Sequence, residues 1–188
     1  MGALRVTGGL LRGRKILVPA HGVVRYTSSK VRAAIFNLTG EVAHYKVLDL
    51  FAGSGSLSIE ALSRGARRAV CVEKDRHMAE VLRENLGRLG LDKDCVVMNM
   101  DVIYAISALS KRGDTFDLIV MDPPYEMGYI QATLNLLKKE SLCGDGSLLV
   151  LEHSIREQLP GFLDPDTVRK RFYGDTAISL IECRTKQR

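Results

Sequence analysis

Residues 47–56, VLDLFAGSGS, carry a short apolar run through an acid into a turn that holds two glycines. The apolar part, Val47–Phe51, predicts a strand, and Leu57–Ser63 predicts the helix that follows it. A strand with apolar residues on both faces is typical of a parallel sheet covered by helices. Ligands of such sheets bind at the carboxyl ends of the strands, where glycines let them approach the backbone closely. The stretch therefore predicts an α/β fold with a binding site at this turn.

The same alternation of strands and helices continues toward the C-terminus. Further apolar strands are predicted at residues 69–73, 95–100, 118–121 and 148–152, with a helix through residues 78–89 and helices after two of the later strands. Residues 168–173 and 177–183 have only Gly174-Asp175 between them and predict an antiparallel hairpin. We expect a mostly parallel, Rossmann-like sheet with helices on both faces and an antiparallel end.

The first forty residues differ from the rest in pattern and in charge. Residues 4–7 and 15–18 predict a hairpin around glycines 8, 9 and 13, and a helix through residues 31–38 can be capped by Ser28 or Ser29 and closed by Gly40. The segment carries seven cations and no acid: Arg5, Arg12, Arg14, Lys15, Arg25, Lys30 and Arg32. The other 148 residues hold 20 basic and 22 acidic side chains. Such a segment attracts a phosphate backbone, although composition alone equally allows a solvated surface.

The remaining composition excludes several classes of protein. No apolar run approaches the roughly 18 residues of a membrane helix, and residues 1–5 lack the apolar stretch of a signal peptide, so we expect a cytoplasmic protein without a membrane partner. Cysteines and histidines show no ligand spacing, so no metal is expected: Cys71, Cys95, Cys143, Cys183, His21, His44, His77 and His153. Cys71 and Cys95 fall in predicted strands, where a thiol behaves as a small hydrophobe.

Three acids follow three successive strands, at Asp49, Glu73 and Asp101. Each alone could be a helix N-cap. Together they favour a ligand with hydroxyl and amino groups, with Glu73 binding ribose hydroxyls and Asp101 an adenine amino group. The glycine turn has no Lys or Arg, and Ser58 stands where a dinucleotide fingerprint needs a third glycine-like residue. An adenosine ligand without phosphates is indicated, and S-adenosylmethionine is such a ligand.

A second motif, Asp122-Pro123-Pro124-Tyr125, follows the apolar strand at 118–121. The prolines fix the backbone and remove its donors, so the segment presents acceptors. The Asp122 carboxylate and the Pro123 carbonyl can hold the two N–H groups of an exocyclic amine, and Tyr125 can stack on its base. A plain turn after a strand is the alternative. The motif predicts methyl transfer to an amino nitrogen, with positioning as the main task of the protein.

With these residues in view, the chain resembles the bacterial 16S rRNA (guanine-N2)-methyltransferase family of class I methyltransferases, from Leu4 to about Glu182. The matching stretches besides the two motifs are residues 12–15, 25–27, 31–37, 60–66 and 72–75. The resemblance implies a seven-stranded sheet with an antiparallel last strand, guanine N2 of 16S rRNA as target and a small-subunit assembly particle as partner. It departs at Tyr26, where the family has proline.

The resemblance also implies the roles of further residues. Those expected at the cofactor are Asp49, Phe51, Gly53, Gly55, Glu73, Lys74, Asp101 and Thr27, and those expected at the RNA are Arg12, Arg14, Lys15 and Arg25. We divide the chain into a basic hairpin and helix at residues 1–45 and a catalytic domain at residues 46–188. We expect the protein to act as a monomer.

Other functions remain open at this point. An N6-adenine methyltransferase shares the acidic motif, whereas protein-glutamine methyltransferases favour Asn in place of Asp122. A non-catalytic RNA-binding assembly factor could keep the fold, although both motifs are intact. An NAD-dependent oxidoreductase is disfavoured by Ser58.

Overall fold

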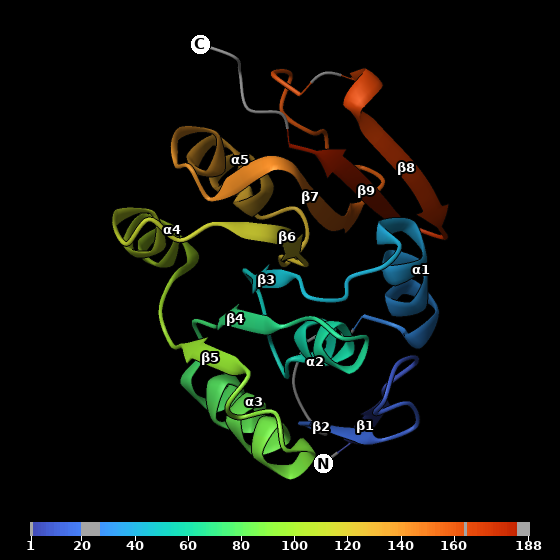
Figure 1. Cartoon of the computed structure of the whole chain (residues 1–188). Coiled ribbons are helices and arrows are strands. Elements are labelled where there is room, and N and C mark those ends of the chain that lie inside the picture. The colour runs from blue at the N-terminus through green and yellow to red at the C-terminus, as the bar shows by residue number, and fades with distance from the viewer. Residues whose placement is uncertain (1, 20–26, 164, 184–188) are drawn as a thin grey trace.

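A seven-stranded sheet forms the centre of the computed structural model, which describes residues 2–19, 27–163 and 165–183 (Figure 1). Its strands in spatial order are β5 (Cys95–Met98), β4 (Arg68–Val72), β3 (Lys46–Asp49), β6 (Phe116–Met121), β7 (Cys143–Ser154), β9 (Thr176–Glu182) and β8 (Val168–Tyr173). The first five run parallel, and β9 runs antiparallel to both of its neighbours. The expected sheet, with its antiparallel last strand, is confirmed.

Helices cover both faces of this sheet. They are α1 (Ser29–Thr39), α2 (Ser56–Ser63), α3 (Arg76–Leu89), α4 (Val102–Lys111) and α5 (Tyr129–Lys139), with a short 3₁₀ turn η1 (Pro165–Thr167) before β8. Successive strand residues point to opposite faces, so Val47 packs with α1, α2 and α3 whereas Leu48 packs with α4 and α5. Both faces are buried, which explains the continuous apolar strands. In the described part of the chain no helix is long and apolar enough to cross a membrane.

Side-chain caps set several helix boundaries near the predicted places. Ser28 Oγ accepts from the Val31 N–H at 3.2 Å to begin α1, which ends at Gly40, and Asp75 and Asp101 cap α3 and α4 in the same way. Besides β1, described below, and β3, which ends at Asp49 rather than Phe51, two strands differ from expectation. β5 ends at Met98 rather than residue 100, and the next residue, Asn99, turns its amide to the carbonyls of Glu73 and Lys74.

The other difference is the length of β7, predicted at 148–152. Cys143 already pairs with Phe116 of β6, although the residues that follow it, Gly144, Asp145 and Gly146, have no apolar pattern that would predict a strand. The strand therefore begins five residues earlier than predicted.

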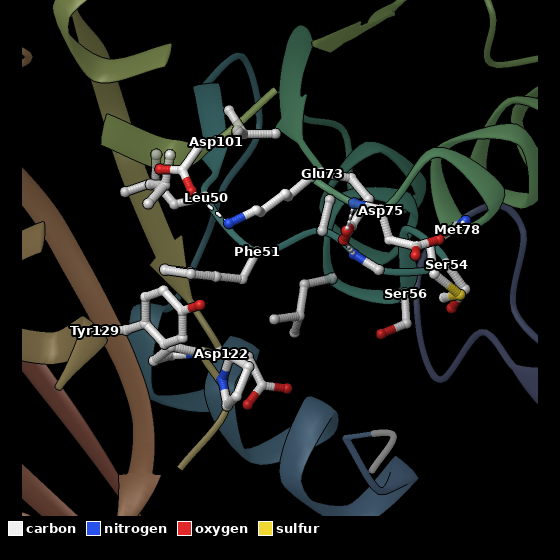
Figure 2. A pocket seen from close by; sticks show the side chains of 18 of the residues that line it. Leu50, Phe51, Ser54, Ser56, Glu73, Asp75, Met78, Asp101, Asp122 and Tyr129 are labelled. Carbon is white, nitrogen blue, oxygen red and sulfur yellow. Dashed lines mark hydrogen bonds and ion pairs between the residues drawn. The ribbon is translucent and has the colours of Figure 1, made fainter. Parts of the chain in front are cut away.

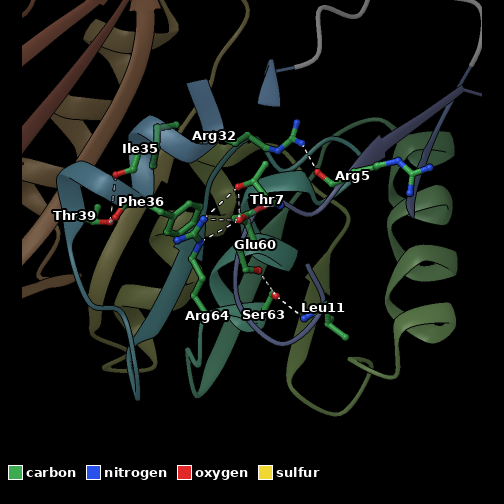
Figure 3. Close-up of polar contacts among 11 residues, drawn as sticks. Arg5, Thr7, Leu11, Arg32, Ile35, Phe36, Thr39, Glu60, Ser63 and Arg64 are labelled. Carbon is green, nitrogen blue, oxygen red and sulfur yellow. Dashed lines mark hydrogen bonds and ion pairs between the residues drawn. The ribbon is translucent and has the colours of Figure 1, made fainter. Parts of the chain in front are cut away.

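The N-terminal hairpin forms a separate two-stranded sheet of β1 (Gly2–Arg5) and β2 (Lys15–Val18). β1 was expected to reach Thr7 but ends at Arg5. The Thr7 N–H and Oγ1 instead donate to the Glu60 carboxylate on α2, at 2.8 and 2.6 Å. Asn85 on α3 exchanges two hydrogen bonds with Leu17 of β2. The contacts of Thr7 with Glu60 (Figure 3) and those of Asn85 with Leu17 dock the hairpin onto the helices beside the sheet.

Candidate functional site

A cavity of about 990 Å³ opens where the strands of the parallel sheet end (Figure 2). Its walls come from the segments that follow β3, β4, β5 and β6, with Thr27 from the N-terminal segment. The expected site residues that line it are Thr27, Phe51, Gly53, Glu73, Lys74, Asp101, Asp122, Pro123 and Tyr125. The structure thus brings the two sequence motifs, more than sixty residues apart, into one cavity. Its size falls at the upper end for small-molecule sites.

Gly55 does not line the cavity. It is the N-cap of α2 with φ of 86°, and a Cβ built there would lie 2.2 Å from Leu82 Cδ1 on α3. The glycine allows the two helices to pack closely, so it shapes the turn from behind rather than meeting a ligand.

Asp49 also lies outside the lining, in the core beneath the glycine turn. Its Oδ2 accepts from Ser58 Oγ at 2.6 Å, and Oδ1 is buried without a hydrogen-bond partner in the described structure. Burial raises the pKa of Asp49 to about 7, against the opposing effect of the Ser58 hydrogen bond. Asp49, expected at the cofactor, is thus a carboxyl group beneath the floor of the cavity rather than one of its lining residues.

Glu73 follows β4 and faces the cavity. Its Oε2 accepts from the Gly53 N–H at 2.8 Å and its Oε1 from the Asp75 N–H at 2.7 Å, which ties the first glycine of the turn to the next strand. Burial raises the pKa of Glu73, while these backbone hydrogen bonds oppose the rise. Each carboxylate oxygen can accept a second donor, so Glu73 keeps the capacity to bind hydroxyl groups.

Lys74 and Asp101 form an ion pair of 3.0 Å at the rim, with Lys74 largely exposed. The Asp101 carboxylate also accepts from the Ile103 N–H at 3.0 Å, and these two donors, the backbone one first, lower the pKa of Asp101. Asp101 is thus both the N-cap of α4 and part of the cavity wall. Apolar side chains on either side, Met100 and Val102, line the cavity beside the acid.

The Asp-Pro-Pro-Tyr segment begins directly after β6, with Pro123 buried. Thr27 Oγ1 donates a hydrogen bond to Asp122 Oδ2 and so fixes one oxygen of this carboxylate. The Tyr125 hydroxyl lies 3.3 Å from Glu152 Oε1 and 3.2 Å from Thr176 Oγ1, which anchor its outer end. Asp122 and Tyr125 are therefore held by groups from three other parts of the chain.

Arg32 links Thr27 to the hairpin, and Figure 3 shows its guanidinium directed at Arg5. Its guanidinium is fully buried, and Nη1 donates to the Thr27 carbonyl and Nη2 to the Arg5 carbonyl, both at 2.7 Å. Burial lowers the pKa of Arg32, and the charges of Glu60 and Glu152 oppose the shift. One rigid fork of donors thus fixes both the end of β1 and the backbone of Thr27.

The hairpin cations Arg12, Arg14 and Lys15 are exposed and lie outside the cavity lining. Arg25, the fourth residue expected at RNA, and Tyr26 lie outside the described residues.

Sequence reasoning missed several lining residues that belong to neither motif. Tyr129 at the start of α5 packs edge-on against Phe51 with ring centroids 5.6 Å apart, and Figure 2 shows the two rings between Asp101 and Asp122. Met78 and Asp75 line the opposite wall. Tyr129 lies four residues after the motif and directly follows Gly128, the N-cap of α5. This glycine is the local signal that could have drawn attention to it.

Neither metal nor thiol chemistry is indicated within the described residues. No group of three His, Cys, Asp or Glu side chains is placed to hold a metal ion. Cys71 and Cys95 are buried with their Sγ atoms 3.1 Å apart, so two thiols on neighbouring strands meet in the core.

The cavity suits the groups of S-adenosylmethionine. Glu73 offers acceptors for ribose hydroxyls, Met100 and Val102 offer apolar surface for an adenine ring, and Asp101 offers an acceptor for its amine. Ser58 stands where a dinucleotide fingerprint needs a third glycine-like residue, so the turn does not match a pyrophosphate site. The acceptors and apolar surfaces of the cavity therefore fit a cationic adenosine ligand that lacks phosphates.

Comparisons with known proteins agree with this geometry. Residues 4–182 match the model of a protein family described as conserved hypothetical protein 95. Ribosomal RNA small subunit methyltransferase D of Escherichia coli is 36% identical over 160 residues, which cover 85% of this chain and 79% of that protein. The structure of a hypothetical protein of Thermus thermophilus matches with a TM-score of 0.83 and 33% identity, covering 96% of this chain and 99% of that one.

A more distant structure carries a ligand of the expected kind. An RNA methyltransferase from Salinibacter ruber, in complex with S-adenosyl-L-homocysteine, matches with a TM-score of 0.66 and 17% identity, over 87% of this chain and 97% of that one. At that identity the likeness concerns the fold alone.

Proposed function

The chain belongs to the family described as conserved hypothetical protein 95 and is similar to ribosomal RNA small subunit methyltransferase D of Escherichia coli, and on this premise we propose that it methylates small-subunit rRNA with S-adenosylmethionine as donor. The target we assign is the exocyclic N2 amine of a guanine. The observation that carries the proposal is the Asp122 carboxylate, which Thr27 holds in the same cavity as Glu73 and Asp101.

S-adenosylmethionine supplies a methyl group already activated by its sulfonium. The protein has to supply position, since the lone pair of a guanine amine is delocalised into the ring and makes a weak nucleophile. We assign the Asp122 carboxylate and the Pro123 carbonyl as acceptors of its two N–H groups, which turns the lone pair toward the methyl. Such orientation accounts for much of an enzyme's rate enhancement. The ring of Tyr125, anchored through its hydroxyl, stacks on the base.

The cofactor roles that we propose follow the walls of the cavity. Glu73 binds the ribose hydroxyls, Asp101 the adenine amine, and Phe51, Gly53 and Lys74 complete the lining. Asp49 and Gly55 act from behind the turn. We also assign a new role to Thr27, orientation of Asp122, because its hydroxyl donates to that carboxylate and its carbonyl accepts from Arg32.

Substrate binding is assigned to the exposed hairpin cations Arg12, Arg14 and Lys15, with Arg25 beside them in sequence. The short hairpin offers little surface to shape a free RNA, so we propose a small-subunit assembly particle as substrate, with the protein acting as a monomer.

Methyl transfer from radiolabelled S-adenosylmethionine to deproteinised 16S rRNA and to small-subunit particles tests the proposal. We expect Asp122→Ala to abolish transfer while the cofactor dissociation constant stays within about threefold, because its partner is the target amine. Glu73→Gln should raise that dissociation constant about tenfold or more, since hydrogen bonds to a charged group are the stronger ones. Full transfer by Asp122→Ala would refute the assigned chemistry.

A further inference from the structure

A second basic surface lies on the edge strand β8, far in sequence from the hairpin. Arg169, Lys170 and Arg171 follow one another on it, and all three are exposed. None of them forms an ion pair with any described residue, and Arg171 Nη1 donates only to the Lys170 carbonyl, at 3.0 Å. β8 itself contains no acid. Its charge is therefore open to a partner.

The register of the sheet assigns these cations to different faces. Side chains of directly paired residues lie on the same face. Arg169 pairs with Leu180 and Arg171 with Ile178, and both partners belong to the core that α1 covers. Lys170 pairs with Ser179 and points to the other face. The two arginines thus share the α1 face, about 6.8 Å apart along the strand.

This face leads directly to the proposed site of methyl transfer. β8 runs parallel to β3 and β6, so its end at Tyr173 lies at the same edge of the sheet as the cavity. After the turn, Thr176 lies 3.2 Å from the Tyr125 hydroxyl. Lys30, in the first turn of α1, has its Nζ 5.9 Å from the centre of the Tyr173 ring. Lys30, Arg171 and Arg169 therefore follow the edge strand β8 away from the Asp-Pro-Pro-Tyr segment.

The helix α1 connects this line with the N-terminal hairpin. Arg32 of α1 bonds to Arg5 at the end of β1, and Lys30 of the same helix lies over Tyr173 at the end of β8. Figure 1 shows α1 between the hairpin and β8. The two basic surfaces therefore lie on either side of one helix, next to the segment that carries Thr27.

We propose that Lys30, Arg171 and Arg169 form a second contact for the RNA phosphate backbone, on the side of α1 opposite to the hairpin. The inference rests on the proposed function, since it takes RNA as the partner. Phosphates bound along β8 would lie on the strand that ends near Tyr125, so they would help to hold the RNA beside the cavity. Charges on an edge strand also discourage pairing with other chains. Any of the three cations on β8 can do that, whereas RNA contact requires the two arginines on the α1 face.

The test compares variants that differ in the place of the lost charge. Arg169→Gln/Arg171→Gln removes the proposed contact, and Lys170→Gln removes the cation on the other face of the same strand. Lys111→Gln/Lys139→Gln removes two exposed charges at the C-terminal ends of α4 and α5, which lie at the opposite edge of the sheet. Binding of a 16S rRNA transcript is measured over a series of salt concentrations.

We expect the double arginine variant to reduce the slope of log K against log salt by about 1.4 to 1.8, the value for two phosphate contacts. Lys170→Gln and the two-lysine control should keep the wild-type slope, and all variants should bind S-adenosylmethionine equally. An unchanged slope for the double arginine variant, or an equal change in the two-lysine control, would overturn the proposal.

The same preparations separate this inference from the proposed function. Transfer of methyl groups to rRNA by the wild type, together with unchanged slopes, would leave the function and remove the surface. A reduced slope without any transfer by the wild type would leave the surface and remove the function.

Discussion

Thr27 and Asp122 are separated by ninety-five residues in the sequence and share a hydrogen bond in the structure. Arg32 fixes the backbone of Thr27 and so orients the Asp122 carboxylate indirectly, although Arg32 itself does not line the cavity. Family resemblance assigned Thr27 to the cofactor. The structure gives its hydroxyl a different partner, and no spacing rule in the sequence could have shown that partner.

Replacing Thr27 by valine removes the hydroxyl and keeps the shape. We expect kcat for methyl transfer to fall about tenfold to a hundredfold with KM for S-adenosylmethionine nearly unchanged, because small misplacements of a reacting group are costly. Thr27→Ser should restore most of the rate. Thr39→Val is the matched control, since the Thr39 hydroxyl bonds only to carbonyls of its own helix. A rise in KM at constant kcat would show instead that Thr27 binds the cofactor.

The buried Asp49 gives a prediction on pH. Its pKa of about 7 in the folded protein lies above the ordinary value of 3.8, so the folded state binds the proton more tightly than the unfolded state. The contribution of Asp49 to the free energy of unfolding therefore falls as the pH rises from about 4 to about 7, by about 1.4 kcal/mol for each pKa unit.

Asp49→Asn removes this titration. In urea melts between pH 4 and pH 8, the free energy of unfolding of Asp49→Asn should gain on the wild type as the pH rises. Asp92→Asn, at an exposed position, serves as the control. Parallel curves for the wild type and Asp49→Asn would show that Asp49 is ionised in the folded protein throughout this range.

At the scale of elements, the hairpin of β1 and β2 is attached to α2 through its connecting loop. The Leu10 N–H donates to the Ser63 carbonyl at 2.7 Å and the Leu11 N–H to Ser63 Oγ at 2.9 Å. Gly9 makes this approach possible, because a Cβ there would lie 1.8 Å from the Ser63 oxygen. This glycine therefore helps to fix the loop that carries Arg12 and Arg14, the cations proposed to bind RNA.

Gly9→Ala should push the hairpin loop away from Ser63 of α2 without changing any charge, while the Thr7–Glu60 contacts can remain. We expect much faster hydrogen exchange at the Leu10 and Leu11 amides and weaker binding to 16S rRNA, with S-adenosylmethionine affinity preserved. Gly13→Ala has the same positive φ and open space around it, so it should cost only about 1–2 kcal/mol of backbone strain. Equal protection of the two amides in both variants would contradict the docking role.

Most elements could be predicted from the sequence, because apolar runs and capping residues act locally. The strand start at Cys143 could not, since a polar stretch of β7 is held in the sheet by pairing with β6. The end of β1 could not either, because Glu60, fifty-three residues away, takes the donors of Thr7. Local patterns fail where the partner comes from a distant segment.

At the scale of the whole molecule, the sequence predicted which acids would meet, and the topology decided which of them face the cavity. Glu73 and Asp101 line it, whereas Asp49 lies below its floor. Counting charges along the chain drew attention to the first forty residues alone. The cations of β8 do not stand out in such a count, because acids elsewhere in residues 41–188 offset their charge. Only the order of the strands places β8 near α1 and the Asp-Pro-Pro-Tyr segment.

The most direct test of the central claim is mass mapping, with primer extension, of small-subunit rRNA from cells that lack this gene. A single N2-methylguanine should be missing from that rRNA, restored by the wild-type gene and not by Asp122→Ala. An rRNA with its full set of methylated guanines in the cells without the gene, or restoration by Asp122→Ala, would contradict it.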